Sequence, residues 1–102
     1  MNKNIKKERN LEVYEAIVSL ETVEECMKLF DDLLSITELR AMEQRFQVAQ
    51  LLDSGMIYSD ILEETGASSA TISRVNRSLQ NAGEGYRSSF ARMKAKKEKS
   101  GE

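Results

Sequence analysis

The 102-residue sequence contains no histidine, no proline, no tryptophan and a single cysteine. Without histidine it lacks the base of a Ser-His or Cys-His catalytic pair, and with one cysteine it lacks the ligands of a zinc site. A disulfide framework within the chain is excluded for the same reason. No arrangement of its acidic residues indicates acid-base catalysis. We therefore predict that the protein is not an enzyme, has no catalytic residues and holds no metal ion or other cofactor.

The sequence also lacks an apolar run long enough to cross a bilayer, and no apolar stretch follows the lysines at its start. These absences predict a cytoplasmic protein that does not associate with a membrane. The content of 40% apolar and 31% charged residues suits one globular domain. We expect this domain to span residues 1–102, with a core at about 8–93. A chain of this length buries a modest fraction of its surface, so a second subunit would add to its stability.

The net charge of −2 is unevenly distributed along the chain. Residues 1–10 carry four basic and one acidic side chain and residues 86–102 six and two, whereas residues 11–57 carry three and ten. We expect the basic ends at 1–7 and 94–102 to be flexible. Basic arms attract phosphates without reading bases, and whether these ends do so stays open at this point.

The absence of proline and the small number of glycines leave long uninterrupted segments, which favour helices. No alternation typical of strands is present, so we predict an all-α fold of about six helices. Apolar spacing places helices at about 8–20, after Thr22, at 36–53, 58–65 and 69–81, and from about 86. Thr22 with Glu25 and Ser35 with Glu38 have the form of capping boxes. The helix at 36–53 carries two apolar stripes, which predicts a place at the centre of the fold or across a dimer interface.

Residues 58–80 have the form of a helix-turn-helix, two short helices joined by a tight turn at Gly66. We expect Ser68 to be the N-cap of the second helix. The apolar residues predicted to form the shared core of the two helices are Ile61, Leu62, Ala67, Ile72 and Val75. The outward side of the second helix consists of small residues and arginine, namely Ser69, Ala70, Ser73, Arg74 and Arg77.

A helix that reads DNA needs short side chains at its N-terminal end, because bulk there would hold the backbone away from the groove floor. Serine hydroxyls and free backbone amides can bind base edges or phosphates, and arginines one turn further on can bind guanine edges or phosphates. The residues of this helix that we predict to bind DNA are Ser68, Ser69, Ala70, Thr71, Ser73, Arg74 and Arg77. The alternative is a helical protein-interaction module that retains the helix-turn-helix shape and uses the serine-rich face for a protein partner.

The run SITELRAMEQRFQVAQLLDSGMIYSDILEETGASSATISRVNRSL, residues 35–79, resembles the tryptophan repressor superfamily, and specifically its tryptophan-repressor-like branch of Gram-positive bacteria. The most specific parts are TGASSATISRVNRSL and the following GEGYR, and the resemblance covers about residues 33–90. It implies a bacterial transcriptional regulator, a repressor, that binds double-stranded DNA as an intertwined homodimer with two projecting helix-turn-helix heads. Where the repressor approaches phosphates with basic and amide residues, this chain has Tyr58, Ser59 and Leu62. Tyr58 could still donate a hydrogen bond to a phosphate.

The resemblance also implies a possible ligand pocket. In the tryptophan repressor the amino acid lies between two arginines, which match Arg45 and Arg74, and near a serine that matches Ser78. Val75 stands where the repressor has a glycine, and its branched side chain would occupy space that the indole ring needs. We therefore expect no response to tryptophan, and we favour a head fixed without any small-molecule corepressor over one that binds another ligand.

Overall fold

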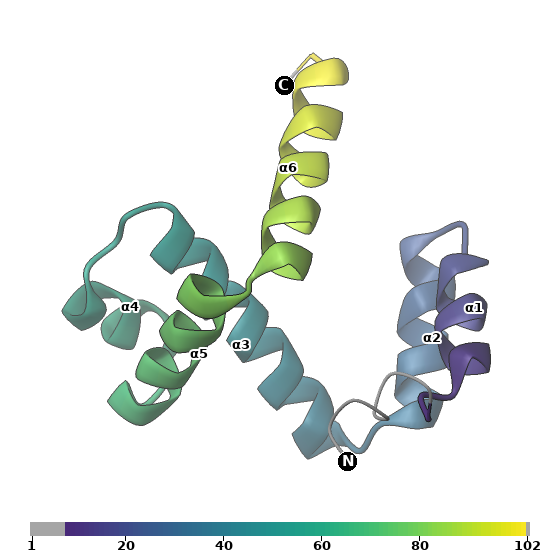
Figure 1. The fold of residues 1–102 in the computed structure, drawn as a ribbon, viewed down its shortest axis with the longest axis horizontal. Helices are drawn as coiled ribbons and strands as arrows, with labels where there is room; N and C mark the ends of the chain where they lie inside the picture. The colour runs from purple at the N-terminus through teal and green to yellow at the C-terminus, as the bar shows by residue number, and fades with distance from the viewer. Residues whose placement is uncertain (1–7, 102) are drawn as a thin grey trace. The chain divides into compact units, whose positions relative to one another are not determined.

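The computed structural model describes residues 8–101 and contains, over that range, six helices and no strand (Figure 1). The helices are α1 Leu11–Val18, α2 Val23–Leu33, α3 Ile36–Asp53, α4 Tyr58–Thr65, α5 Ser69–Asn81 and α6 Glu84–Lys99. The prediction of an all-α fold is thus confirmed. None of the described helices is long and apolar enough to span a membrane.

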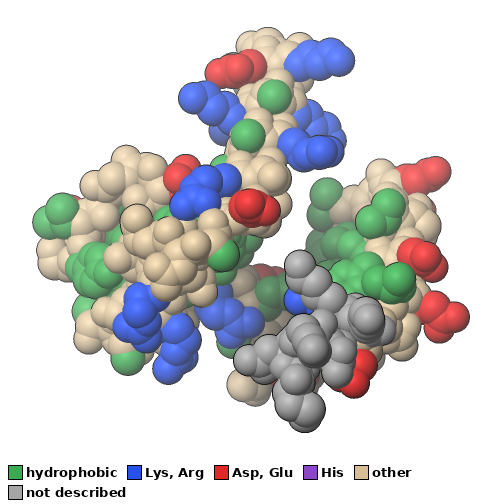
Figure 2. All heavy atoms as spheres, viewed as in Figure 1, with side chains coloured by type: hydrophobic (Ala, Val, Ile, Leu, Met, Phe, Trp, Pro, Cys, Tyr) green, Lys and Arg blue, Asp and Glu red, His purple; other side chains and the backbone are tan. Residues whose placement is uncertain are grey.

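The contacts divide the chain into two compact units, Met1–Leu39 and Arg40–Glu102. Whether both act as one domain over residues 1–102, as the sequence predicts, stays a prediction. The basic segment 1–7 lies outside the described residues. The other basic segment, predicted to be flexible, continues α6 as regular helix as far as Lys99. Its side chains are exposed, and Figure 2 shows several of them along α6.

The bounds of α3, α4 and α5 agree with the sequence prediction. Local signals mark most of these ends, but α4 has Ile57 as its N-cap, whose side chain makes no capping hydrogen bond. α3 ends in a Schellman motif, in which Met56 donates its backbone N–H to Leu51 at 3.1 Å and Gly55 donates to Leu52 at 3.0 Å. Gly55 there has a φ of 93°. The first helix is shorter than predicted, since Asn10 caps it and accepts a hydrogen bond from the Glu12 N–H at 3.0 Å.

The capping box at the start of α3 is reciprocal. The Glu38 N–H donates to the Ser35 hydroxyl at 3.1 Å, and the Ser35 N–H donates to the Glu38 carboxylate at 2.8 Å. These backbone and side-chain hydrogen bonds with Ser35 lower the pKa of Glu38 below its usual value of 4.5. The ionised carboxylate therefore stabilises α3 above that pH, and the contribution is lost as the pH falls through the lowered pKa. At the start of α2 the predicted capping box is half formed. The Glu25 N–H donates to the Thr22 hydroxyl at 3.1 Å, but the Glu25 carboxylate accepts from the Glu21 N–H, at 2.9 Å, and not from Thr22.

The helix pair α1 and α2 contains no buried residue. Many of its large apolar side chains are exposed on the surface of the pair, as Figure 2 shows. They include Leu11, Tyr14, Val18, Val23, Met27 and Leu33. Two amphipathic helices that leave their apolar faces exposed do not stabilise each other well, so a further surface is needed to cover them.

The core of the other unit is built by α3, the helix-turn-helix and the residue that joins its helices. It consists of Val48, Ala49, Ile61, Ala67, Ile72 and Val75. The prediction of a core shared by α4 and α5 is confirmed except at Leu62, which is 46% exposed. Successive residues of a helix point about 100° apart, so Leu62 turns outward when its neighbour Ile61 is fully buried.

Aromatic side chains attach α6 to α3. Phe46 of α3 meets Phe90 of α6 edge to face, with ring centroids 5.3 Å apart, and Tyr86 stacks on Phe90 at 5.9 Å. Such pairs stabilise beyond the area that they bury. The start of α6 is therefore held against the middle of α3.

Candidate nucleic-acid interface

The turn between α4 and α5 is built from three consecutive residues. Gly66 ends α4 with a φ of 74° and donates its N–H to the Leu62 carbonyl at 2.9 Å. A left-handed conformation of this kind favours glycine, because it has no Cβ. The Thr65 hydroxyl donates to the Ile61 carbonyl at 2.7 Å and accepts from the Ala67 N–H at 3.0 Å. These local bonds fix the angle between the two helices.

Helix α3 also forms a hydrogen bond to this turn. The side-chain amide of Gln44 donates a hydrogen bond to the Thr65 carbonyl at 3.3 Å. This carbonyl belongs to the last turn of α4, where helix carbonyls have no partner within the helix. The bond therefore ties the helix-turn-helix to the helix on which it packs.

Ser68 immediately precedes α5 and is its N-cap, which confirms the prediction. The Ser68 hydroxyl accepts the Thr71 N–H at 3.1 Å and lies 3.1 Å from the Thr71 hydroxyl, to which it donates. Both hydroxyls are thus engaged in the start of the helix. Thr71 is half-buried, whereas Ser68 is exposed. A direct contact of either side chain with DNA stays a prediction.

The predicted outward side of α5 is accessible in the structure. Ser69, Ala70, Arg74 and Arg77 are exposed and Ser73 is half-buried. Tyr58, at the start of α4, is 39% exposed. Among residues 69–81 there is no acidic side chain. This face therefore carries positive charge and small side chains, which suits an approach to phosphates and base edges.

The acidic residues of the head lie on the other helix. Asp60, Glu63 and Glu64 of α4 are all exposed. Carboxylates close to phosphates would weaken DNA binding through Coulomb repulsion. The charge of the head is thus divided between an acidic α4 and a basic α5.

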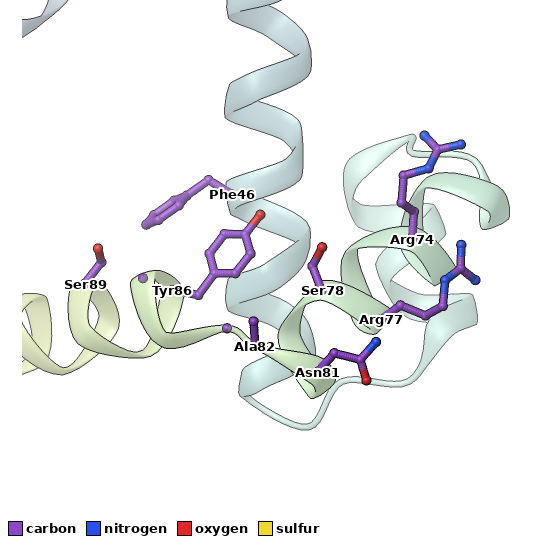
Figure 3. Close-up of a pocket in the computed structure, with 10 residues that line it drawn as sticks. Phe46, Arg74, Arg77, Ser78, Asn81, Ala82, Tyr86 and Ser89 are labelled. Carbon is purple, nitrogen blue, oxygen red and sulfur yellow. The ribbon is translucent and has the colours of Figure 1, made fainter. Parts of the chain in front are cut away.

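An open hollow of about 790 Å³ lies between the C-terminal half of α5 and the start of α6. Phe46 and Tyr86 lie at one end of it, and Ser78 lies between them and the two arginines (Figure 3). The side chains of Arg74 and Arg77 extend away from the aromatic rings. The arginines are therefore available to a partner that approaches the outer side of α5.

The predicted ligand pocket is only partly assembled. Arg45, Arg74 and Val75 line one hollow of about 200 Å³ between α3 and α5. Ser78 lines the larger hollow instead, next to Arg74. Val75 is 3% exposed and belongs to the core cluster, so its methyl groups pack against the head itself. Whether the small hollow takes a ligand stays a prediction.

Val75→Gly is expected to lower the free energy of unfolding by roughly 2–3 kcal/mol, because it removes buried methyl groups and places glycine within a helix. Val75→Ala should lose about half as much. Thermal melts of the three proteins check this.

Calorimetric titration of tryptophan into the wild type should give no binding heat. Tight binding by the wild type would overturn the expectation that Val75 excludes the amino acid.

Two supporting residues were missed from the sequence, Gln44 and Arg87. The Arg87 guanidinium donates to the Ala82 carbonyl at 2.6 Å and to the Leu79 carbonyl, at the end of α5. A basic side chain near a helix C-terminus can bind its last carbonyls, so a basic residue shortly after α5 was a usable signal. Gln44 gave no such signal, since its partner Thr65 lies 21 residues further along the chain.

Within residues 8–101 there is no group of three or more acidic or cysteine side chains that could hold a metal ion.

Helix α3, the short helix α4, a glycine turn and the exposed helix α5 define a helix-turn-helix protein of the DNA-binding type.

The chain belongs to the Trp repressor family, because the family model for the Trp repressor protein matches residues 8–94. It is 43% identical over 83 residues to the uncharacterized protein YerC of Bacillus subtilis (strain 168), a match that covers 81% of this chain and 80% of YerC. The crystal structure of a candidate Trp repressor from Staphylococcus aureus superposes with a TM-score of 0.82 at 44% identity, over 88% of this chain and 93% of that one. A TrpR-like protein from Eubacterium eligens ATCC 27750 gives a TM-score of 0.82 at 42% identity, over 91% and 95%.

These similarities confirm the family and its tryptophan-repressor-like branch in Gram-positive bacteria. The fold is that of a DNA-binding regulator.

Proposed function

We propose that this protein is a sequence-specific regulator of transcription, a repressor without catalytic activity, that binds double-stranded DNA as a homodimer. The observation that carries the proposal is the exposed face of α5, which combines small side chains with Arg74 and Arg77 and has no acidic residue. The family to which the chain belongs supports it, since that family consists of DNA-binding regulators.

In the proposed complex α5 lies in the major groove. Ser69, Ala70 and Ser73 allow its N-terminal half to approach the bases, and Arg74 and Arg77 bind guanine edges or phosphates. The first helical hydrogen bond of α5 runs from the Ile72 N–H to the Ser68 carbonyl, at 3.0 Å. Of the N–H groups that precede it, that of Thr71 is bound to the Ser68 hydroxyl, and those of Ser69 and Ala70 can bind a phosphate. Tyr58 contributes one hydrogen bond to a phosphate from α4.

The homodimer is supported by α1 and α2. Their exposed apolar side chains need a partner surface, and a second copy of the chain offers the same apolar face in return. In the proposed cytoplasmic regulator the head is fixed without tryptophan or another corepressor, because Val75 fills its core.

Arg77→Ala is expected to weaken binding to a selected duplex roughly ten- to a hundredfold at each half-site, because a bidentate arginine contact is lost. Gel-shift titrations against DNA selected from genomic fragments by the wild type check this result. Arg92→Ala is the matched control, since it removes the same charge from an exposed position of α6. Wild-type binding no stronger than to non-specific DNA would contradict the proposed function.

A protein-interaction module remains the alternative, and the exposed apolar side chains of Ile57, just before α4, and Leu62, within it, favour it. Elution from heparin distinguishes the two functions. An interaction module with a net charge of −2 should pass through the column, whereas a DNA-binding protein with a basic α5 should be retained and released by salt.

A further inference from the structure

We infer that Arg87 is a positioning residue that sets the direction of the recognition helix α5, and with it the spacing of the DNA half-sites that the protein accepts. This inference rests on the proposed function for its DNA consequence. Its structural part stands on the corner between α5 and α6 alone.

The corner is held by both backbone and side chain. Gly83 turns the chain with a φ of 66°, and its carbonyl accepts the Arg87 N–H at 2.9 Å. The guanidinium of Arg87 then reaches back to two carbonyls of α5, those of Leu79 and Ala82. These carbonyls lie at the end of the helix, where partners within the helix are lacking and a positive charge is favourable.

The guanidinium fork makes this contact directional. An ammonium group would neutralise the helix end as a single point charge, but it would not hold two carbonyls in one plane. Because the fork binds carbonyls that are three residues apart, it resists rotation of α5 about the corner. A cap that only satisfied one carbonyl would leave that rotation free.

Arg87 follows Tyr86, whose ring stacks on Phe90 and lies 6.2 Å from Phe46 of α3. The backbone of Arg87 is therefore held near α3 by the aromatic contacts of Tyr86. In the turn between α4 and α5, Gln44 of α3 holds the Thr65 carbonyl. The helix-turn-helix is thus tied to α3 at its turn through Gln44, and at the end of α5 through Arg87 and the aromatic residues beside it.

In a homodimer the direction of α5 in each subunit determines how far apart the two recognition helices lie. Half-sites one helical turn apart are read together only when both helices point correctly. If Arg87 is removed, each head gains freedom about the corner. The protein should then bind DNA in which the distance between the two half-sites has been changed.

The structural part is tested with two spin labels, at Ser69→Cys and Lys96→Cys in a Cys26→Ala background, diluted with unlabelled protein. Pulsed dipolar spectroscopy should give one narrow distance distribution for the parent protein and for Arg92→Ala. Arg87→Ala should broaden it at least about twofold, and Arg87→Lys, which can hold one carbonyl, should lie between. An unchanged distribution in Arg87→Lys and Arg87→Ala would overturn the inference. If Arg87→Ala does not fold, the width of the distance distribution in Arg87→Lys tests the inference.

The DNA consequence is tested with the duplex selected by the wild type and with versions that have one base pair more or less between half-sites. We expect the wild type and Arg92→Ala to lose about tenfold or more in affinity on either change, which is the cost of losing a good base contact. Arg87→Ala should lose less than about threefold in affinity when one base pair is added or removed between the half-sites. Equal discrimination in all three proteins would refute the role in spacing. If the wild type selects no sequence, the proposed function fails, while the label distances still decide the role of Arg87.

Discussion

Met27→Glu is expected to convert the protein from a dimer into a monomer. Met27 lies on the apolar side of α2, is 58% exposed in the isolated chain and follows the exposed Val23 by one helical turn. In a dimer with twofold symmetry each change occurs twice in the interface. The loss of apolar burial together with an unpaired buried carboxylate costs at least about 3 kcal/mol per protomer. The dissociation constant should therefore rise by about ten-thousandfold.

Sedimentation velocity at micromolar protein concentration measures this change. Lys28→Glu is the matched control, because it places the same side chain at the next position of α2, on its polar side. It should leave the dimer intact. A Met27→Glu protein that sediments as the wild type does would show that α2 is not in the interface. Melting should also depend on concentration for the wild type and not for the variant, since dissociation is coupled to unfolding only in a dimer.

Gly83→Ala is expected to lower the free energy of unfolding by about 3 kcal/mol, which corresponds to a fall in Tm of more than about 10 °C. Two costs add at this position. A φ of 66° is unfavourable for a residue with a Cβ. An added Cβ would also overlap the Leu79 carbonyl oxygen and lie 3.1 Å from the carbonyl carbon, and this backbone cannot yield without opening the end of α5.

Gly85→Ala is the control for this substitution, two residues further along. An added Cβ at Gly85 meets nothing within 4 Å. Alanine in the first turn of α6 should leave stability unchanged or raise it by up to about 1 kcal/mol. Thermal melts followed by circular dichroism compare the two variants. A similar loss in both would mean that the corner is not constrained by Gly83.

The helix ends of the head were predictable because their signals are local. Ser68 before α5, Gly66 after α4 and Gly55 after α3 each act on groups within a few residues. The outward position of Leu62 was not predictable from spacing. Both Ile61 and Leu62 fit an apolar pattern, and only the packing of α4 against α3 and α5 decides which of the two is buried.

The exposure of the candidate site's side chains was predictable, whereas the residues that support the site were not identified. The exposure of Arg74 and Arg77 follows from their spacing along one helix. Gln44 acts on the backbone carbonyl of a residue 21 positions away, which no residue pattern marks, whereas the position of Arg87 just after α5 was a usable signal. The separation of Ser78 from the hollow of Arg45 depends on how α5 packs against α3, which is a tertiary feature.

The hydrogen bonds between Ser68 and Thr71 have a consequence for how such regulators diverge. Their hydroxyls complete the start of α5, whereas within residues 8–101 no hydrogen bond involves the side chains of Ser69 or Ser73. Removal of the Ser68 hydroxyl would weaken the helix start by about 1 kcal/mol, whereas substitutions at 69, 70 and 73 remove no capping hydrogen bond. In the proposed complex with DNA, the side chains at these three positions can therefore change without a cost to the start of α5.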